Sequence, residues 1–178
     1  MLKELLLLPL TVYVRLKAIK TINTCSKKRI FLFDIDNTIA DTIPSFEHYS
    51  NVSEAKRVST LAFFIKMHRL IRILKRSPNN KIIFLTARGF KSKQATIKWL
   101  TQFGFPPGTD ELFIVRNASE KIKILKEVST NSTIYFIDDL AYIEKNGNVQ
   151  VYYDLIKKVE KLKLKYFGLN QIKDAIKS

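Results

Sequence analysis

The sequence of 178 residues contains one cysteine, Cys25, and two histidines, His48 and His68. A single cysteine excludes an intramolecular disulfide and a thiolate cluster for zinc. It fits a reducing compartment, and we interpret Cys25 as a small buried side chain without a nucleophilic role. His68 falls on the apolar side of an expected helix, so we assign it to the core or its boundary and not to catalysis.

Acidic residues are also scarce, since sixteen Asp and Glu stand against thirty-one Lys and Arg and leave a formal charge of +15. A field of this sign attracts polyanions and slows the approach of cations. The partners that it favours are nucleic acid, an anionic membrane surface and a phosphorylated substrate. The alternative is a solvated lysine-rich surface without a specific partner.

The sequence also lacks an apolar run long enough to cross a membrane. The most apolar stretch, residues 1–24, is broken by Pro9 and by charged residues. It falls short of the roughly 20 apolar residues of a spanning helix, and no cleavage site of small residues follows it. Two interpretations stay open: a helix packed on the domain, or an amphipathic helix in a membrane interface, with a signal anchor as a minor third. We therefore treat residues 1–24 as a separate segment of a cytoplasmic protein that is either free or peripheral on a membrane.

Residues 25–178 alternate apolar runs with helical patterns, and no linker composition divides them. Ile30–Phe33, Ile82–Leu85 and Ile134–Ile137 are continuous apolar runs, which are typical of strands buried on both faces. A fourth strand is expected at 112–115. Helices are expected from near Ser59 to Ser77, around Trp99, and from Ser119 as N-cap to Val128. This order predicts one α/β domain with a Rossmann-like parallel sheet flanked by helices.

Smaller elements are expected near the C-terminus. Asn146-Gly147 between Ala141–Ile143 and Val149–Tyr153 predicts a tight hairpin. The alternation of lysines with apolar residues predicts an amphipathic helix over Lys157–Lys165. A short apolar stretch follows at Tyr166-Phe167, and the last ten residues have a helical pattern.

Three of the apolar runs end in side chains suited to catalysis. The first is followed by Asp34-Ile35-Asp36-Asn37-Thr38, the second by Thr86-Ala87-Arg88 and the third by Asp138-Asp139. Ligands of open parallel sheets bind outside the carboxyl ends of the strands, where the loops converge. We therefore expect these three groups to form one site if the strands are neighbours.

The side chains in this site predict a metal-assisted reaction on a phosphate. Carboxylates that lie together repel one another, and oxygen ligands without a nearby histidine suit Mg²⁺ better than zinc. Such an ion would neutralise a phosphoryl group and hold it in line for attack by Asp34, giving an aspartyl-phosphate. Asp36 would protonate the leaving oxygen and then deprotonate the attacking water. The hydroxyl of Thr86 and a lysine would donate to the phosphoryl oxygens.

In this order, the groups resemble the motifs of the haloacid dehalogenase (HAD) superfamily of phosphatases, over roughly residues 28–140. The segment from Asp34 to Thr38 matches the first motif, DxDxT, and Thr86 matches the second. Asp138-Asp139 matches the fourth motif, an acidic pair that holds magnesium. The third motif is a lysine, and Lys121 fits it better than Lys123 because apolar residues follow one and four places later.

This resemblance implies an Mg²⁺-dependent phosphatase and not a dehalogenase, because the second aspartate of the first motif is present. The implied catalytic residues are Asp34, Asp36, Thr86 and Lys121. The implied metal ligands are Asp34, Asp36, Asp138 and Asp139. Substrate contacts are assigned to Asn37, Thr86 and Arg88, since an arginine two places after the second motif can reach a substrate through its planar fork.

The resemblance also bears on the substrate. Neither residues 42–58 nor the segment between Arg88 and Lys121 has room for a cap domain, so we expect an open site. An open site suits a large substrate, or a lid supplied by another protein. The segment from Ala87 to Gly104 loosely resembles the corresponding region of polynucleotide 3′-phosphatases and of lipin-type phosphatidate phosphatases.

Several substrates and one non-catalytic function stay open at this point. Nucleic-acid ends and lipid phosphates are compatible with the charge and the open site, and nucleotide or sugar phosphates would need a lid. Against nucleic acid, no aromatic and basic platform for a single strand stands out in the sequence. The alternative is a non-catalytic protein of the same fold that binds anionic membrane or nucleic acid. The sequence does not set an oligomeric state.

Overall fold

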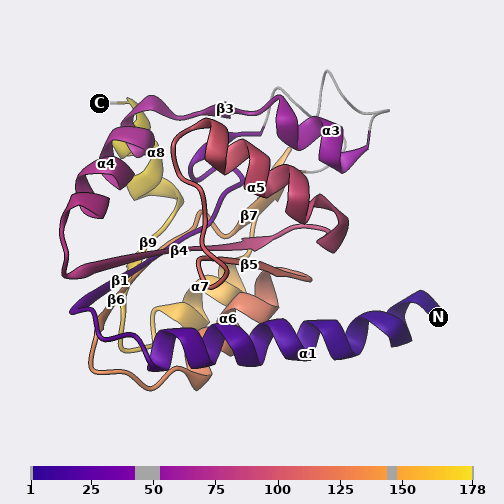
Figure 1. The fold of residues 1–178 in the computed structure, drawn as a ribbon, viewed down its shortest axis with the longest axis horizontal. Coiled ribbons are helices and arrows are strands. Elements are labelled where there is room, and N and C mark those ends of the chain that lie inside the picture. Colours follow the sequence, from indigo (N-terminus) through magenta and orange to yellow (C-terminus); the bar gives the residue numbers. More distant parts are fainter. Residues whose placement is uncertain (1, 43–52, 144–147, 178) are drawn as a thin grey trace.

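The computed structural model describes residues 2–42, 53–143 and 148–177, which form two layers of helices around a central sheet (Figure 1). The sheet has five parallel strands in the order β5-β4-β1-β6-β9. The predicted α/β fold with a Rossmann-like parallel sheet is therefore confirmed. The strands are β1 (Arg29–Phe33), β4 (Asn80–Ala87), β5 (Leu112–Val115), β6 (Thr133–Ile137) and β9 (Lys165–Phe167).

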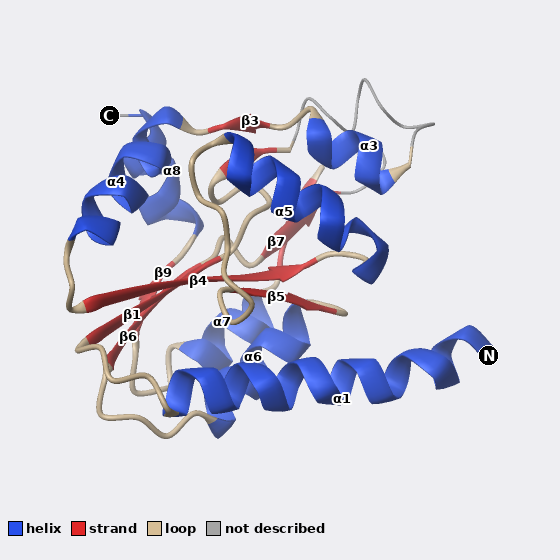
Figure 2. Ribbon diagram, viewed as in Figure 1, coloured by secondary structure: helices blue, strands red, loops and turns tan. Residues whose placement is uncertain are grey.

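Helices cover both faces of this sheet (Figure 2). One face carries α3 (Glu54–Ser59), α4 (Ile65–Arg76), α5 (Lys93–Gln102), which follows a 3₁₀ turn at Phe90–Ser92, and α8 (Leu169–Lys177). The other face carries α1 (Leu2–Asn23), α6 (Ala118–Glu127) and α7 (Tyr153–Val159). Two short antiparallel pairs, β2 (Ala40–Asp41) with β3 (Ala62–Phe63) and β7 (Ala141–Ile143) with β8 (Val149–Val151), complete the described chain.

Alternation along the central strand explains why its run is apolar throughout. Phe31 and Phe33 pack into the cluster under α4, α5 and α8, whereas Ile30 and Leu32 pack into the cluster under α1, α6 and α7. Because β1 lies between β4 and β6 and is covered on both faces, its end is held in a fixed position. This is the strand end that carries Asp34.

The helix expected from near Ser59 begins later, at Ile65. The preceding residues form α3 and then β3, which pairs with β2. Tertiary contacts prevent a continuous helix, because the indole of Trp99 donates to the Leu61 carbonyl at 2.9 Å and the Phe64 N–H donates to the Ile39 carbonyl at 2.9 Å. His68 packs among aromatic rings next to Phe63, with 5.4 Å between the ring centroids. His48 lies outside the described residues.

Two further boundaries differ from the prediction. The N-cap of α6 is Asn117 and not Ser119, because the Asn117 side chain accepts from the Glu120 N–H at 3.1 Å. The helix expected over Lys157–Lys165 is wrong, since α7 ends at Val159. Leu162 and Leu164 pack against the apolar cluster in the turn that follows, and Lys165 begins β9.

The predicted hairpin is confirmed in its strands. β7 and β8 pair antiparallel with Tyr142 opposite Gln150, and Tyr153 begins α7 and is not part of the strand. The turn at Asn146-Gly147 lies outside the described residues. Within the described ranges, no domain-sized insertion covers the carboxyl edge of the sheet, as expected for a protein without a large cap.

The C-terminal half of α1 packs on the domain. Ala18 and Ile22 are buried in the cluster with α6, and Lys17 pairs with Asp110 at 3.0 Å. Asn23 accepts from the Ser129 N–H at 2.9 Å. No helix among the described residues is long and apolar enough to cross a membrane. The division at residue 24 and the interfacial membrane helix stay predictions.

Candidate active site

The polar segments that follow the three central strands meet at one edge of the sheet. The register of the sheet continues past β1, since the Asp34 N–H donates to the Ile137 carbonyl at 2.9 Å. On the next strand, the Asp138 N–H donates to the Phe167 carbonyl at 3.1 Å. Thr86 lies near the end of β4, on the other side of β1. Backbone pairing thus fixes these side chains at the place that the sequence predicted.

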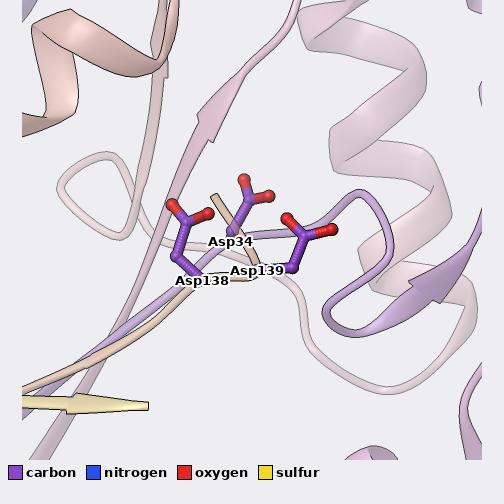
Figure 3. A group of neighbouring side chains, drawn as sticks. All are labelled: Asp34, Asp138 and Asp139. Carbon is purple, nitrogen blue, oxygen red and sulfur yellow. The ribbon is translucent and has the colours of Figure 1, made fainter. Parts of the chain in front are cut away.

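Asp34, Asp138 and Asp139 form a buried acidic triad. One carboxylate oxygen from each lies within 4.8 Å of the others, and the three groups point to the same side (Figure 3). Burial, together with the neighbouring carboxylates, raises the pKa of Asp34 to about 7 and that of Asp139 to about 8. Within the described chain, Asp139 Oδ2 is buried without a hydrogen-bond partner. A cation would relieve this repulsion, so the triad has the donors and the spacing of a metal site.

Lys121 lies against this triad from α6. Its Nζ is 2.7 Å from Asp34 Oδ1 and 2.7 Å from Asp138 Oδ2. Burial would lower the pKa of Lys121, but the two carboxylates outweigh burial and raise it, so the ammonium stays charged. Lys123 pairs with Glu120 instead, and its side chain is 52% exposed compared with 3% for Lys121. Of the two lysines that the sequence offered, the structure brings Lys121 to the site.

Asp36 is not a member of the triad and is held by Arg88. Arg88 Nε is 2.6 Å from Asp36 Oδ2, and Arg88 Nη2 donates to Asp36 Oδ1 at 2.8 Å. The third nitrogen, Nη1, donates to Thr96 Oγ1 at 3.2 Å, and the guanidinium is buried. Burial would raise the pKa of Asp36, but the charge of Arg88 outweighs it and lowers the pKa. This pair, joined by two hydrogen bonds, positions Asp36, and no pattern in the sequence predicts it.

The loop after β1 is tightly wound. The Ile35 carbonyl accepts from the N–H groups of Thr38, Ile39 and Ala40 at 3.3, 3.0 and 2.9 Å. Asn37 adopts a φ of 52°, in the left-handed region that asparagine tolerates, and its Oδ1 accepts from the Thr42 hydroxyl. These bonds place Asn37 at a turn beside the site; its predicted contact with substrate stays a prediction.

Two buried threonines lie at the site, and only one of their hydroxyls has a hydrogen-bond partner in the described part of the chain. Thr38 Oγ1 accepts from the Asp139 N–H at 3.3 Å, which joins the first motif to the acidic pair. The Thr86 hydroxyl is fully buried and has no hydrogen-bond partner among the described residues. A buried hydroxyl without a partner is costly, so Thr86 has donor capacity for a bound ligand.

Two supporting contacts had no signal in the sequence. The Tyr166 hydroxyl donates to the Asp138 carbonyl at 3.0 Å, from the edge strand β9. Glu54 on α3 accepts from the Gly89 N–H at 3.1 Å. A Cβ at residue 89 would lie 2.5 Å from Glu54 Oε2, so Gly89 permits α3 to approach the end of β4. Both contacts come from elements whose position depends on tertiary packing.

Known proteins resemble this chain over a short segment or at low sequence identity. No family model matches the chain. A Bacillus cereus protein named "Putative nucleotidase" is 37% identical over 60 residues, which are 34% of this chain and 30% of that protein. The chain therefore spans less than a third of this relative.

Solved structures give a wider match at lower identity. A chain in the structure of the Pnkp1/Rnl/Hen1 complex superposes with a TM-score of 0.54 at 14% identity, over 81% of this chain and 46% of that chain. A chain in the structure of the Pnkp1/Rnl/Hen1 RNA repair complex superposes with a TM-score of 0.54 at 13% identity, over 83% of this chain and 44% of that chain. At such identities the likeness shows the fold alone, and this chain corresponds to less than half of either one.

Proposed function

We propose that the protein is an Mg²⁺-dependent phosphomonoester hydrolase of the HAD superfamily, with Asp34 as the nucleophile. The observation that carries the proposal is the arrangement at the end of β1, where buried Asp34 lies with two further carboxylates and the ammonium of Lys121. The short match to a protein named as a nucleotidase and the fold shared with chains of an RNA repair complex support a phosphoester substrate.

The residues of the triad fit a hard divalent cation. All donors are carboxylate oxygens, and Asp139 Oδ2 lacks a partner in the described chain. Asp34, Asp138 and Asp139 would hold Mg²⁺ through these oxygens. When bound, the ion supplies charge neutralisation for a phosphoryl group. The carboxylate of Asp36 lies with Arg88, and its expected role as a metal ligand stays a prediction.

The proposed reaction has two steps. A carboxylate oxygen of Asp34 attacks phosphorus, and the bond from phosphorus to the leaving oxygen breaks as Asp36 gives that oxygen a proton. In the second step Asp36 takes a proton from water, which attacks phosphorus, releases phosphate and restores Asp34. Lys121 and the Thr86 hydroxyl would donate to the phosphoryl oxygens throughout.

The contact with Arg88 affects the two steps differently. Arg88 stabilises the ionised form of Asp36, which is the form that accepts a proton from water. Protonation of Asp36 for the first step requires this pair to loosen when substrate binds. Arg88 is therefore proposed to act mainly by positioning Asp36, in addition to the substrate contact predicted from the sequence.

Hydrolysis of p-nitrophenyl phosphate tests the proposed function. We expect turnover with Mg²⁺, loss of turnover when EDTA removes the ion, and recovery when Mg²⁺ is restored. The same assay with nucleotides, terminally phosphorylated oligonucleotides and phosphatidate covers the substrates that the sequence left open. If the folded protein with Mg²⁺ hydrolyses none of these, the non-catalytic binding protein becomes the better interpretation.

Binding of Mg²⁺ should strengthen as the pH rises from 6 to 9. In the metal-free protein the pKa of Asp34 is about 7 and that of Asp139 about 8, so near neutral pH Asp34 is partly protonated and Asp139 is mostly protonated. A cation must displace these protons, so its apparent affinity rises with pH. Both pKa values lie above those of the unfolded chain, so the metal-free fold loses stability as the pH rises from about 4 to about 8.

Thermal unfolding with and without Mg²⁺ measures this effect. The increase in Tm caused by Mg²⁺ should be small at pH 6 and should reach several degrees at pH 9. Asp139→Asn removes one titrating ligand and should reduce the dependence on pH. An increase of the same size at every pH would show that the triad does not bind the ion.

A further inference from the structure

A pocket of about 620 Å³ lies between the start of α6 on one side and the β7–β8 pair with the start of α7 on the other. Asn117, Ala118 and Ser119 line the first side, and three tyrosines, Tyr142, Tyr152 and Tyr153, line the second. Its volume is in the range of pockets that hold small organic ligands. The proposed chemistry uses none of these side chains. We refer to this site as the tyrosine pocket.

The tyrosine pocket is formed by segments that are close in sequence to Asp139 and Lys121, although neither residue lines it. The Tyr152 N–H donates to the carbonyl of Leu140 at 2.8 Å, and Leu140 directly follows Asp139. On the other side, Ala118 precedes Lys121 by three residues of α6, which is roughly 5 Å along the helix. Burial and Tyr142 raise the pKa of Tyr152. The charge of Lys121 acts to lower this pKa, and the charge of Asp139 acts to raise it. The pocket is therefore a candidate site for the part of a substrate that lies beyond its phosphate.

The aromatic side of the pocket is open to solvent. Tyr142 is 42% exposed and Tyr153 is 69% exposed. Tyr142 and Tyr152 also lie against each other, with 5.0 Å between ring centroids. Flat rings that remain in contact with water provide surfaces on which a second aromatic ring can stack. The pocket is therefore better suited to a planar ring than to a plain sugar.

Polar side chains complete the lining. Gln150 offers both a donor and an acceptor, and Asp154 and Lys158 carry opposite charges at the same pocket. Because these charges offset each other, the pocket does not favour a second phosphate. An acyl chain would also leave these polar groups without partners. The lining thus favours a neutral aromatic group that carries hydrogen-bonding atoms at its edge.

We propose that the tyrosine pocket binds the base and sugar of a nucleotide whose phosphomonoester lies at Asp34. The inference rests on the proposed function only for the position of the phosphate. The base would lie against the rings of both Tyr142 and Tyr153, and Gln150 and Asp154 would bond to the base edge and the sugar hydroxyls. A mononucleotide and the terminal nucleotide of a nucleic-acid strand present the same chemistry, and the test separates these two sources.

Steady-state hydrolysis of AMP and of ribose 5-phosphate tests the proposal, because the second substrate lacks only the base. Tyr153→Ala and Tyr142→Ala should each raise KM for AMP about tenfold and leave ribose 5-phosphate unchanged. Tyr153→Phe should behave as the wild type, since it keeps the ring. Tyr13→Ala is the matched control, because Tyr13 is 60% exposed on α1 and does not line the pocket. Equal losses on both substrates would overturn the proposal, because they would indicate a structural role for the tyrosines.

Calorimetry of AMP binding gives a measurement that does not depend on turnover. In the Asp34→Asn protein, the further change Tyr153→Ala should weaken AMP binding about tenfold and leave binding of inorganic phosphate unchanged. If AMP binds in this manner but no phosphomonoester is hydrolysed by the wild type, the proposed function fails and the pocket stands. If the wild type hydrolyses phosphomonoesters and the tyrosine variants behave like it on AMP, the pocket proposal fails alone.

The source of the nucleotide follows from a third comparison. AMP and a short oligoribonucleotide with a terminal phosphate are hydrolysed by the wild type and by Tyr153→Ala. The source with the larger value of kcat/KM, and with the larger loss in the variant, identifies the form that the pocket accepts. If the variant loses activity on neither source, the pocket does not bind a base.

Discussion

Asp34→Asn should lower kcat by about 10⁴-fold or more, because no other group can form the covalent bond to phosphorus. Asp34 is buried at the end of the central strand, with Lys121 Nζ at 2.7 Å and two carboxylates nearby. The amide of asparagine has almost the same shape but is a poor nucleophile. Asp36→Asn should cost less, about 10²–10⁴-fold, which is the usual size of a general acid–base contribution.

The substitution Asp34→Asn should leave the fold intact, so a loss of activity would reflect the lost nucleophile and not a loss of stability. A carboxylate whose pKa burial raises to about 7 is destabilising in the metal-free protein at higher pH, so the neutral amide should leave Tm unchanged or raise it. Asp110→Asn is the matched control, since Asp110 pairs with Lys17 on the surface and should keep full activity. Activity of Asp34→Asn within about tenfold of the wild type would exclude Asp34 as the nucleophile.

The part of the site that could be predicted is the part fixed by backbone pairing of neighbouring strands. Apolar runs identify β1, β4 and β6, and the polar residues after each run must meet if the three strands adjoin. The register Phe33↔Phe84 and Phe33↔Ile137 aligns these three ends. The common location of Asp34, Thr86 and Asp138 could therefore be predicted from the local sequence pattern and one assumption about strand order.

The pair between Asp36 and Arg88 could not be predicted in this way. Arg88 follows the second strand and resembles a residue that faces substrate, whereas the structure buries it against Asp36 and Thr96. The direction of a long side chain depends on what surrounds it, and no periodicity records this. The same holds for Tyr166, whose bond to the Asp138 carbonyl requires β9 to be the edge strand beside β6.

The tyrosine pocket could be predicted from the sequence only in part. Once the hairpin is assumed, pairing of Tyr142 with Gln150 makes Tyr142 and Tyr152 diagonal neighbours on one face of it. From the sequence alone, no aromatic and basic platform for a single strand stood out. The structure shows that an exposed group of tyrosines exists, and that its members come together through the hairpin and the start of α7.

Lys121→Met should destabilise the metal-free protein by about 3–5 kcal/mol, since it leaves Asp34 and Asp138 buried without a cation. Methionine keeps the length and apolar stem of lysine, so the loss reflects the charge and not a cavity. Lys123→Met is the matched control, because Lys123 is on the same helix with an exposed side chain and should change stability by no more than about 0.5 kcal/mol. Urea unfolding of both variants measures the difference, and equal effects would show that Lys121 does not stabilise the triad.

Two conditions should reduce the cost of Lys121→Met if this explanation is correct. Mg²⁺ would neutralise the same carboxylates, so its addition should restore part of the lost stability. Protons should act in the same way on Asp34, because a carboxyl with a pKa of about 7 is largely neutral at pH 6, so the variant should lose less stability there than at pH 9. Turnover of the variant should remain about 10²-fold below that of the wild type, even with Mg²⁺ at the optimum pH. The ion cannot replace the hydrogen bond from Nζ to the phosphoryl oxygens. A variant that Mg²⁺ makes both stable and fully active would show that Lys121 only balances charge in the empty site.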